Sequence, residues 1–248
     1  MVTKGLVSSR SQADSWIGLG KVTVDGKVAR KSGVFVNIQA DVQLTAVDKY
    51  VSRAGLKLAS VAKLLGVDFR GKSVLDVGSS TGGFTDYALQ NGASKVFAVD
   101  VGTEQLHPSL RGNNKIDLHE KTDIRDVIVG KFIKGDALYG GSNTLIADVP
   151  DVVVMDVSFI SLREILPHIA RELSGKNTQI VAMLKPQFEA GREQVNKGII
   201  KNDAVRRQIL RDFEVWAKQY FVVVDKRDSE VAGSKGNRER FYLLKTVQ

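Results

Sequence analysis

Residues 75–86 read Leu-Asp-Val-Gly-Ser-Ser-Thr-Gly-Gly-Phe-Thr-Asp, and this stretch decides the fold. An apolar run that includes Val74 and Val77 leads into it, and apolar residues at helical spacing, Phe84 and Ala88, follow. The pattern predicts a buried strand, a glycine-rich turn and the start of a helix. Because glycine has no Cβ, such a turn brings bare backbone and a helix N-terminus against a ligand.

The residues around this turn favour a nucleoside cofactor that carries no phosphate. Asp100 ends the next apolar run, where a carboxylate accepts hydrogen bonds from a ribose. The glycine spacing from Gly78 is not that of a dinucleotide turn, because Ser80 stands at the second glycine position. Asp76 would repel a pyrophosphate but can hold an ammonium group. We therefore predict S-adenosylmethionine, which has an ammonium, a sulfonium and no phosphate; the alternative is a tight turn that binds no ligand.

Strand and helix patterns alternate on both sides of the turn. The expected strands cover 73–77, 95–100, 115–119, 152–157 and 178–184, and the expected helices between them include 84–90 and 162–173. This alternation predicts an α/β fold with a doubly wound, mostly parallel sheet, Rossmann-like and of the S-adenosylmethionine methyltransferase type. Two final strands, 221–225 and 241–245, are joined by a glycine-containing loop, which is typical of an antiparallel edge.

The composition limits the chemistry. At 248 residues the chain has room for one α/β domain and a small extra module. It has no cysteine, which excludes disulfides and thiolate zinc sites, and its three histidines lack zinc-ligand spacing, so we expect no metal site. No apolar stretch is long enough to span a membrane, and residues 1–14 lack the apolar core of a secretory signal. We therefore expect a cytoplasmic protein without a membrane partner.

Positive charge is concentrated in the first part of the chain. Residues 1–72 hold twelve Lys and Arg against five Asp, which is +7 of the total net charge of +8. A basic module beside a nearly neutral one suggests that the first part holds a polyanion. The alternative, of equal weight on charge alone, is a solvated basic surface that aids solubility.

The N-terminal segment reads as a compact α+β unit. Ser8 and Ser9 can cap a short helix, the Asp25–Gly26 turn predicts a hairpin over 21–28, and residues 34–38 predict a further strand. The stretches 5–13 and 17–27 resemble the small RNA-binding module named for ribosomal small-subunit protein S-four. In that family the first helix begins further upstream, so with Met1 at the start we expect it to be largely missing, either through a truncated start or in an abbreviated module.

This resemblance sets the expected domain division and RNA contacts. We expect an abbreviated RNA-binding module at 1–45, a linker with the start of the first helix at 46–60, and an S-adenosylmethionine-dependent methyltransferase domain at 61–248. The expected RNA-binding residues are polar or basic and lie in the first 53 positions: Ser9, Arg10, Lys21, Lys27, Arg30, Lys31 and Arg53.

Polar residues also follow later strands, at the edge where the glycine turn is expected. They lie in 155–159, 183–189 and 236–241, and residues 50–57 add a fourth segment. Doubly wound folds place their sites at this carboxyl edge. Methyl transfer to a hydroxyl requires in-line alignment and a base, which these polar side chains can supply.

These segments together resemble the TlyA family, also called haemolysin A, of FtsJ-like ribose 2′-O-methyltransferases. The match runs over nearly the whole chain and is carried by YVSRAGLKL at 50–58, LDVGSSTGGFTD at 75–86, AVDVG at 98–102, DVSFISL at 156–162, LKPQFEAGR at 184–192 and GNRERF at 236–241. The resemblance implies a Lys-Asp-Lys-Glu catalytic tetrad, which falls on Lys57, Asp156, Lys185 and Glu239. It also implies cytidine 2′-hydroxyls in ribosomal RNA as targets, with ribosomal RNA or ribosomal subunits as partners.

Within this tetrad we favour Lys185 as the general base. A lysine base requires a pKa below the ordinary value of about 10.4. Nearby carboxylates raise a lysine pKa, whereas a second lysine, a sulfonium and desolvation lower it, so the sequence leaves the balance open. Asp156 and Glu239 then orient the lysines and the ribose, and Lys57 positions the hydroxyl or a phosphate. Taken singly, each residue also has an ordinary structural explanation, such as a helix cap or a solvated side chain.

The expected cofactor-binding residues surround the glycine turn and the two strands beside it: Asp76, Gly78, Ser79, Ser80, Gly82, Gly83, Phe84, Asp100, Val101 and Asp123. Asp123 is assigned to the adenine, although a carboxylate at a helix start explains it equally well.

Absent residues narrow the reaction further. Carbon-5 pyrimidine methylation normally needs a cysteine nucleophile, and the prolines, at 108, 150, 167 and 186, exclude the Asn/Asp-Pro-Pro-aromatic signature of amino-group methylation. Ribose methylation is the simplest remaining reaction. The alternatives are a non-catalytic RNA-binding or ribosome-assembly factor and, with least support, a pore-forming haemolysin, because no amphipathic insertion segment is visible.

Overall fold

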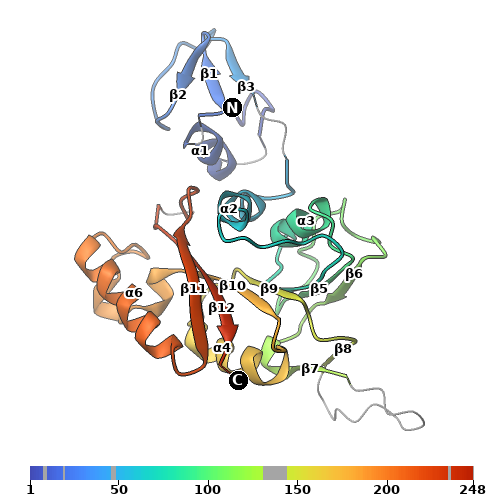
Figure 1. Ribbon diagram of the computed structural model, residues 1–248. Coiled ribbons are helices and arrows are strands. Elements are labelled where there is room, and N and C mark those ends of the chain that lie inside the picture. Colours follow the sequence, from blue (N-terminus) through green and yellow to red (C-terminus); the bar gives the residue numbers. More distant parts are fainter. Residues whose placement is uncertain (8–9, 19, 46–48, 131–143, 234–235, 248) are drawn as a thin grey trace.

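The computed structural model describes residues 1–7, 10–18, 20–45, 49–130, 144–233 and 236–247. A small N-terminal unit stands beside a larger α/β domain (Figure 1). In the small unit, α1 (Arg10–Gly18) packs against β1 (Val22–Val24), β2 (Lys27–Ala29) and β3 (Val42–Leu44), which pair antiparallel in the order β2-β1-β3. A core of Val7, Ala13, Trp16 and Val22 lies between helix and strands, and Leu56 of α2 (Arg53–Ala62) packs against it.

The prediction of a strand over 34–38 is wrong. The strand that pairs with the second edge of β1 is β3, in the register Val22↔Leu44, and residues 34–38 form a loop. The apolar side chains of that loop, including Phe35 and Ile38, are exposed. The sequence pattern marked apolar β-formers correctly but could not show which stretch would pair with the outer edge of β1.

The large domain is built on a sheet in which the described residues form seven strands in the order β11-β12-β10-β9-β4-β5-β6. These strands are β4 (Ser73–Val77), β5 (Lys95–Val99), β6 (Ile116–His119), β9 (Val152–Met155), β10 (Gln179–Leu184), β11 (Phe221–Asp228) and β12 (Arg240–Thr246). The five strands from β10 to β6 are parallel, and β12 pairs antiparallel with both β10 and β11. The predicted parallel sheet and antiparallel edge are therefore confirmed.

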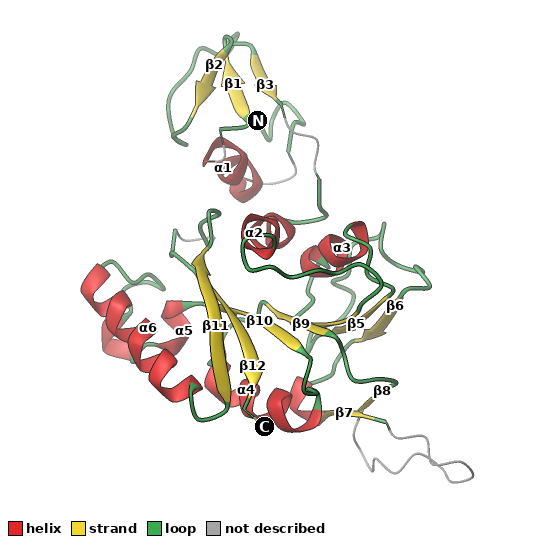
Figure 2. Cartoon of the chain, viewed as in Figure 1, coloured by secondary structure: helices red, strands yellow, loops and turns green. Residues whose placement is uncertain are grey.

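Helices cover both faces of this sheet (Figure 2). On one face lie α2 and α3 (Gly83–Gln90), and on the other lie α4 (Leu162–Glu172) and α6 (Asp203–Ala217). Alternate strand residues serve the two cores, since Val74 packs with α2 and α3 while Leu75 packs with α4 and α6. Short elements complete the chain: η1 (Ile124–Asp126), β7 (Val127–Val129), β8 (Thr144–Ile146), α5 (Pro186–Glu189) and η2 (Arg192–Gln194). In the described part of the chain, no helix has both the length and the apolar character needed to cross a membrane.

This topology decides where polar residues meet. β4, β5, β9 and β10 all end at one edge of the sheet, because they are parallel. β12 runs the other way, so its first residue, Arg240, pairs with Leu184 at the end of β10. Residues that follow the parallel strands and residues that precede β12 therefore share the carboxyl edge.

Candidate active site

The glycine turn after β4 has the backbone that its sequence predicts. Gly78 and Gly82 have φ values of +77° and +88°, and Ser80 between them has +46°. A Cβ on Gly78 would stand 3.1 Å from the carbonyl oxygen of Asp156, so glycine lets the end of β4 approach the end of β9 closely. A Cβ on Gly83 would collide with Ser52 and Ala54, so the turn also packs directly on the start of α2.

Asp76 is the buried acid beneath this turn. Thr85 Oγ1 donates a hydrogen bond to its Oδ2 at 2.6 Å, while its buried Oδ1 has no hydrogen-bond partner. Burial raises the pKa of Asp76 to about 7, and the neighbouring charge of Asp156 adds to that shift. An unpartnered buried carboxylate oxygen favours a cationic ligand, so the site fits the ammonium group of S-adenosylmethionine.

Asp100 follows β5 and closes the other side of the turn. Its Oδ2 accepts a hydrogen bond from the Ser80 amide at 2.8 Å, and its Oδ1 accepts one from the Gly102 amide at 2.7 Å. Each carboxylate oxygen has a second acceptor site, so Asp100 can still accept a ribose hydroxyl. The residue therefore holds the turn and faces the cavity that the turn borders.

Two cavities lie along this turn. The larger, about 380 Å³, is lined by Gly78, Ser80, Asp100, Val101 and Asp123. The smaller, about 140 Å³, is lined by Asp76, Gly78, Ser79, Ser80 and Phe84. The structure thus gathers eight of the ten expected cofactor-binding residues around the two cavities. Gly82 and Gly83 line neither cavity, because they pack against Leu106 and Leu110 and against α2 respectively.

Asp123 both caps the short helix η1 and lines the larger cavity. Its carboxylate caps η1 by accepting a hydrogen bond from the Arg125 amide at 2.9 Å, and it pairs with the Arg125 guanidinium at 2.6 Å. The same guanidinium holds the pKa of Asp123 below its usual value. The residue also lines the larger cavity, so the helix-start role is observed and the adenine contact stays a prediction.

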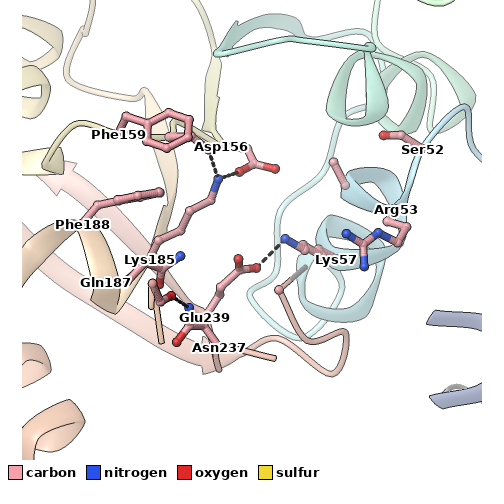
Figure 3. A pocket seen from close by; sticks show the side chains of 14 residues that line it. Ser52, Arg53, Lys57, Asp156, Phe159, Lys185, Gln187, Phe188, Asn237 and Glu239 are labelled. Atoms are coloured by element: carbon pink, nitrogen blue, oxygen red, sulfur yellow. Dashed lines mark hydrogen bonds and ion pairs between the residues drawn. The ribbon is translucent and has the colours of Figure 1, made fainter. Parts of the chain in front are cut away.

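The four residues of the expected tetrad converge beside these cavities as two ion pairs (Figure 3). Lys185 Nζ lies 2.6 Å from Asp156 Oδ1, and Lys57 Nζ lies 2.5 Å from Glu239 Oε2. Lys57, Lys185 and Glu239 are 7%, 9% and 2% exposed, so these pairs are largely shielded from water. Two lysines and two carboxylates balance in charge, which makes their shared burial tolerable.

A third cavity, of about 440 Å³, opens in front of the two ion pairs. All four tetrad residues line it, and so does Arg53 at the start of α2. Asp156 and Ser158 line this cavity and both cavities along the glycine turn, so the three spaces share one wall after β9. A donor group over the turn and an acceptor in the third cavity would therefore meet at Asp156 and Lys185.

Several residues of this pocket were not singled out from the sequence. Ser158 Oγ accepts a hydrogen bond from Lys185 Nζ at 2.7 Å. Phe159 is 92% exposed with a φ of +67°, and its ring lies 5.2 Å from that of Phe188. Gln187 and Asn237 also line the pocket. All of them lie inside or next to the segments that follow β9, β10 and β11, which was the signal available in the sequence.

The expected RNA-binding residues separate into two places. Arg10, Lys21, Lys27, Arg30 and Lys31 are exposed on the N-terminal unit. Arg53, by contrast, lines the pocket that holds the tetrad. Ser9 lies outside the described residues.

Sheet order and an acid followed by a glycine turn place this molecule in the Rossmann-like methyltransferase class. Comparison with known proteins identifies the family. The model of the FtsJ-like methyltransferase family matches residues 50–246, and that of the S4 domain matches residues 1–42. The chain belongs to the FtsJ-like methyltransferase family and carries an S4 domain before the catalytic one. The family implies S-adenosylmethionine as cofactor.

Relatives of similar length support this assignment. The 16S/23S rRNA (cytidine-2′-O)-methyltransferase TlyA of Mycobacterium tuberculosis is 34% identical over 99% of this chain and 88% of its own. Hemolysin A of Brachyspira hyodysenteriae is 37% identical over 96% of this chain and 94% of its own. A solved Streptococcus thermophilus protein, provisionally named a hemolysin, is 34% identical with a TM-score of 0.73, covering 99% of this chain and 86% of that one. The predicted fold class and TlyA-type family are therefore confirmed.

Proposed function

We propose that this chain methylates the 2′-hydroxyl of a cytidine ribose in ribosomal RNA, with S-adenosylmethionine as donor. The observation that carries the proposal is the convergence of Lys57, Asp156, Lys185 and Glu239 around one pocket beside the glycine turn. Ribosomal RNA and cytidine come from the names of relatives such as the M. tuberculosis enzyme. The S4 domain and the basic N-terminal unit support an RNA substrate.

In the proposed reaction Lys185 acts as the general base. Its ammonium contacts Asp156 Oδ1 and Ser158 Oγ, and an ammonium has a third donor position with which it can contact the acceptor hydroxyl. Losing a proton gives the amine a lone pair that accepts the proton of the 2′-hydroxyl. Asp156 and Ser158 hold Lys185 at the wall shared by the three cavities, so the amine meets the hydroxyl at a fixed place.

Lys57 and Glu239 form the opposite side of the pocket. Their ion pair is nearly excluded from solvent, which fixes the Lys57 ammonium in the cavity. A fixed cation there attracts the ribose oxygen or the adjacent phosphate and orients the acceptor for in-line attack. Arg53, on the same face of α2, adds a second cation toward the RNA backbone.

On the donor side, when S-adenosylmethionine is bound it supplies an electrophilic methyl group on a sulfonium. Asp76 would hold its ammonium and Asp100 its ribose, and Gly78 lines both cavities along the turn. The cavity of about 380 Å³ next to Asp100 and Asp123 has room for the nucleoside.

We extend the proposal to the division of the chain. Residues 1–45 bind RNA through Arg10, Lys21, Lys27, Arg30 and Lys31, residues 46–60 connect the parts and supply Arg53 and Lys57, and residues 61–248 hold the donor and the remaining tetrad residues. The concentration of positive charge before residue 73 supports this arrangement.

The proposal is tested by incubating the purified protein and labelled S-adenosylmethionine with 16S rRNA, 23S rRNA and ribosomal subunits. We expect label at a ribose that then resists alkaline hydrolysis, and loss of label with Lys185→Ala. Label-free RNA from every particle, or label on a base, would overturn the proposal. Calorimetry with S-adenosylmethionine provides the control that the variant still binds the donor.

A further inference from the structure

A short hairpin turn at residues 196–199 forms part of the substrate pocket. The backbone groups of Asn196 and Ile199 pair in both directions, at 3.1 and 2.9 Å. Lys197 and Gly198 between them have φ values of +50° and +82°, as a two-residue turn with two left-handed positions requires. Gly198 lines the same cavity as the tetrad. This turn stands apart from the main sheet, so something else must hold it against the pocket.

The Asn237 side chain provides that attachment. Its Nδ2 donates to the carbonyl oxygen of Gly198 at 2.8 Å, and its Oδ1 accepts from the amide of Ile200 at 3.0 Å. The residue is 4% exposed. Because one partner is an acceptor and the other a donor, only one orientation of the carboxamide satisfies both. The carboxamide thus makes one donated and one accepted hydrogen bond with the backbone of the turn, as a paired residue in a β-sheet does.

The main chain around Asn237 leads directly to Glu239. The carbonyl oxygen of Asn237 accepts from the Gly233 amide at 2.9 Å, and the carbonyl oxygen of Glu239 accepts from the Ser229 amide at 3.0 Å. A Cβ on Gly233 would lie 2.8 Å from Glu239 Oε1, so the backbone passes against the carboxylate that pairs with Lys57. A shift of Asn237 therefore displaces Glu239 as well.

We propose that Asn237 is a positioning residue for methyl transfer, which fastens the 196–200 turn to the segment that carries Glu239. In this arrangement the carboxamide of Asn237 contacts one wall of the substrate pocket, and its main chain leads to the carboxylate that orients Lys57 (Figure 3). The inference rests on the proposed function. It adds that acceptor alignment depends on a residue whose polar side-chain atoms are directed to the backbone of the 196–200 turn.

The test is a double-mutant cycle on kcat at saturating donor and rRNA. Asn237→Ala removes both hydrogen bonds, and a misplacement of about 1 Å near reacting groups costs on the order of 10²-fold in rate, so we expect at least a tenfold loss. The dissociation constant for S-adenosylmethionine stays within twofold. Because part of the effect of Asn237 passes through Glu239, the double variant Asn237→Ala/Glu239→Gln loses less kcat than the product of the two single losses.

Matched variants separate alignment from general damage. Asn202, just after the 196–200 turn, caps α6 by accepting a hydrogen bond from the Ala204 amide. The control variant Asn202→Ala removes this contact and leaves kcat within twofold of the wild-type value. Ile200→Pro removes the amide that donates to Asn237 Oδ1 and reproduces the kcat loss from the opposite side of the contact. Effects of Asn237→Ala and Glu239→Gln that multiply, or an unchanged kcat in Asn237→Ala, would overturn the inference. If the wild-type protein itself labels no ribose, the proposed function fails first, and the two failures are distinguished.

Discussion

The proposed donor side and the proposed acceptor side of the site are built differently. The donor side comes mainly from one contiguous stretch, from Asp76 through the turn to Phe84, and much of it is backbone. The acceptor side takes one charged residue from each of four segments between positions 57 and 239, joined by ion pairs. Backbone in a turn is fixed by local geometry, whereas side-chain pairs from distant elements depend on the whole fold. A short sequence pattern can therefore specify the proposed donor side, whereas the proposed acceptor side depends on the topology.

The largest effect is expected on the acceptor side, at Asp156. Asp156→Asn removes the charge that holds Lys185 at 2.6 Å, so the amine loses its fixed position at the wall that the three cavities share. We expect kcat to fall on the order of 10²-fold or more, measured by single-turnover methylation of rRNA. Asp151→Asn, in the exposed pair with Lys72 at the opposite end of the sheet, serves as control. If the kcat of Asp156→Asn lies within threefold of the wild-type value, the two sides differ less than proposed.

On the donor side, Asp76→Asn is expected to separate binding from stability. The substitution removes the negative charge opposite the ammonium, so donor affinity falls about 10- to 100-fold, as for a lost charged hydrogen bond. It also removes a buried negative charge whose Oδ1 has no hydrogen-bond partner, so the ligand-free protein melts at a higher temperature at pH 8.

Calorimetry and thermal melts measure the two effects of Asp76→Asn. Asp68→Asn, on the exposed surface, should change neither quantity appreciably. Unchanged donor affinity in Asp76→Asn would remove Asp76 from the donor site.

Donor affinity should also depend on pH through Asp76. Its pKa is raised to about 7 in the ligand-free protein, so below pH 7 an increasing fraction carries a proton that must leave before an ammonium binds. Between pH 7 and pH 5 the dissociation constant therefore rises toward about tenfold per pH unit, and binding releases protons.

The same raised pKa makes the ligand-free protein lose stability as pH rises toward 7, because the folded state binds more protons there than the unfolded one. Titrations in buffers of different ionisation enthalpy measure the proton release. Asp76→Asn should flatten the pH dependence of binding, and an equal slope in the variant would assign it to another group.

The smallest effect is expected from the exposed N-terminal unit. Arg30→Ala combined with Lys31→Ala removes two proposed phosphate contacts, so KM for rRNA rises a few-fold and kcat stays unchanged. The slope of log affinity against log salt concentration should fall by about one for each lost contact. Lys226→Ala, at the far edge strand where Lys226 pairs with Glu214, gives the control. An unchanged salt slope would place the RNA elsewhere.

Much of the donor side could be read from the sequence because its signals are local. The glycine turn, the acid before it and Asp100 after the next strand were all predicted, and the positive φ values at Gly78 and Gly82 follow from residue type. Gly82 and Gly83 were also predicted to bind the cofactor; they pack against neighbouring side chains, and a cofactor contact there stays a prediction. A glycine pattern shows that a Cβ would not fit, but it does not show whether a ligand or a neighbouring protein segment occupies that space.

The acceptor side could be predicted only in part. Family resemblance named Lys57, Asp156, Lys185 and Glu239, but no spacing in the chain indicated that Lys57 would pair with Glu239 and Lys185 with Asp156. The Lys57–Glu239 pair follows from the reversed direction of β12, which brings residue 239 to the carboxyl edge. The Lys185–Asp156 pair follows from the parallel pairing of β10 with β9. The strand expected at 34–38 failed for a similar reason, because apolar composition does not reveal which edge is free for pairing.

One consequence follows from the wall after β9, where Asp156 and Ser158 border all three cavities. If this segment moves when one ligand binds, the cavity of the other ligand also changes shape. Thermodynamic linkage then requires reciprocity: the factor by which bound rRNA changes the donor affinity equals the factor by which bound donor changes the rRNA affinity. The two binary affinities alone therefore do not give the stability of the ternary complex.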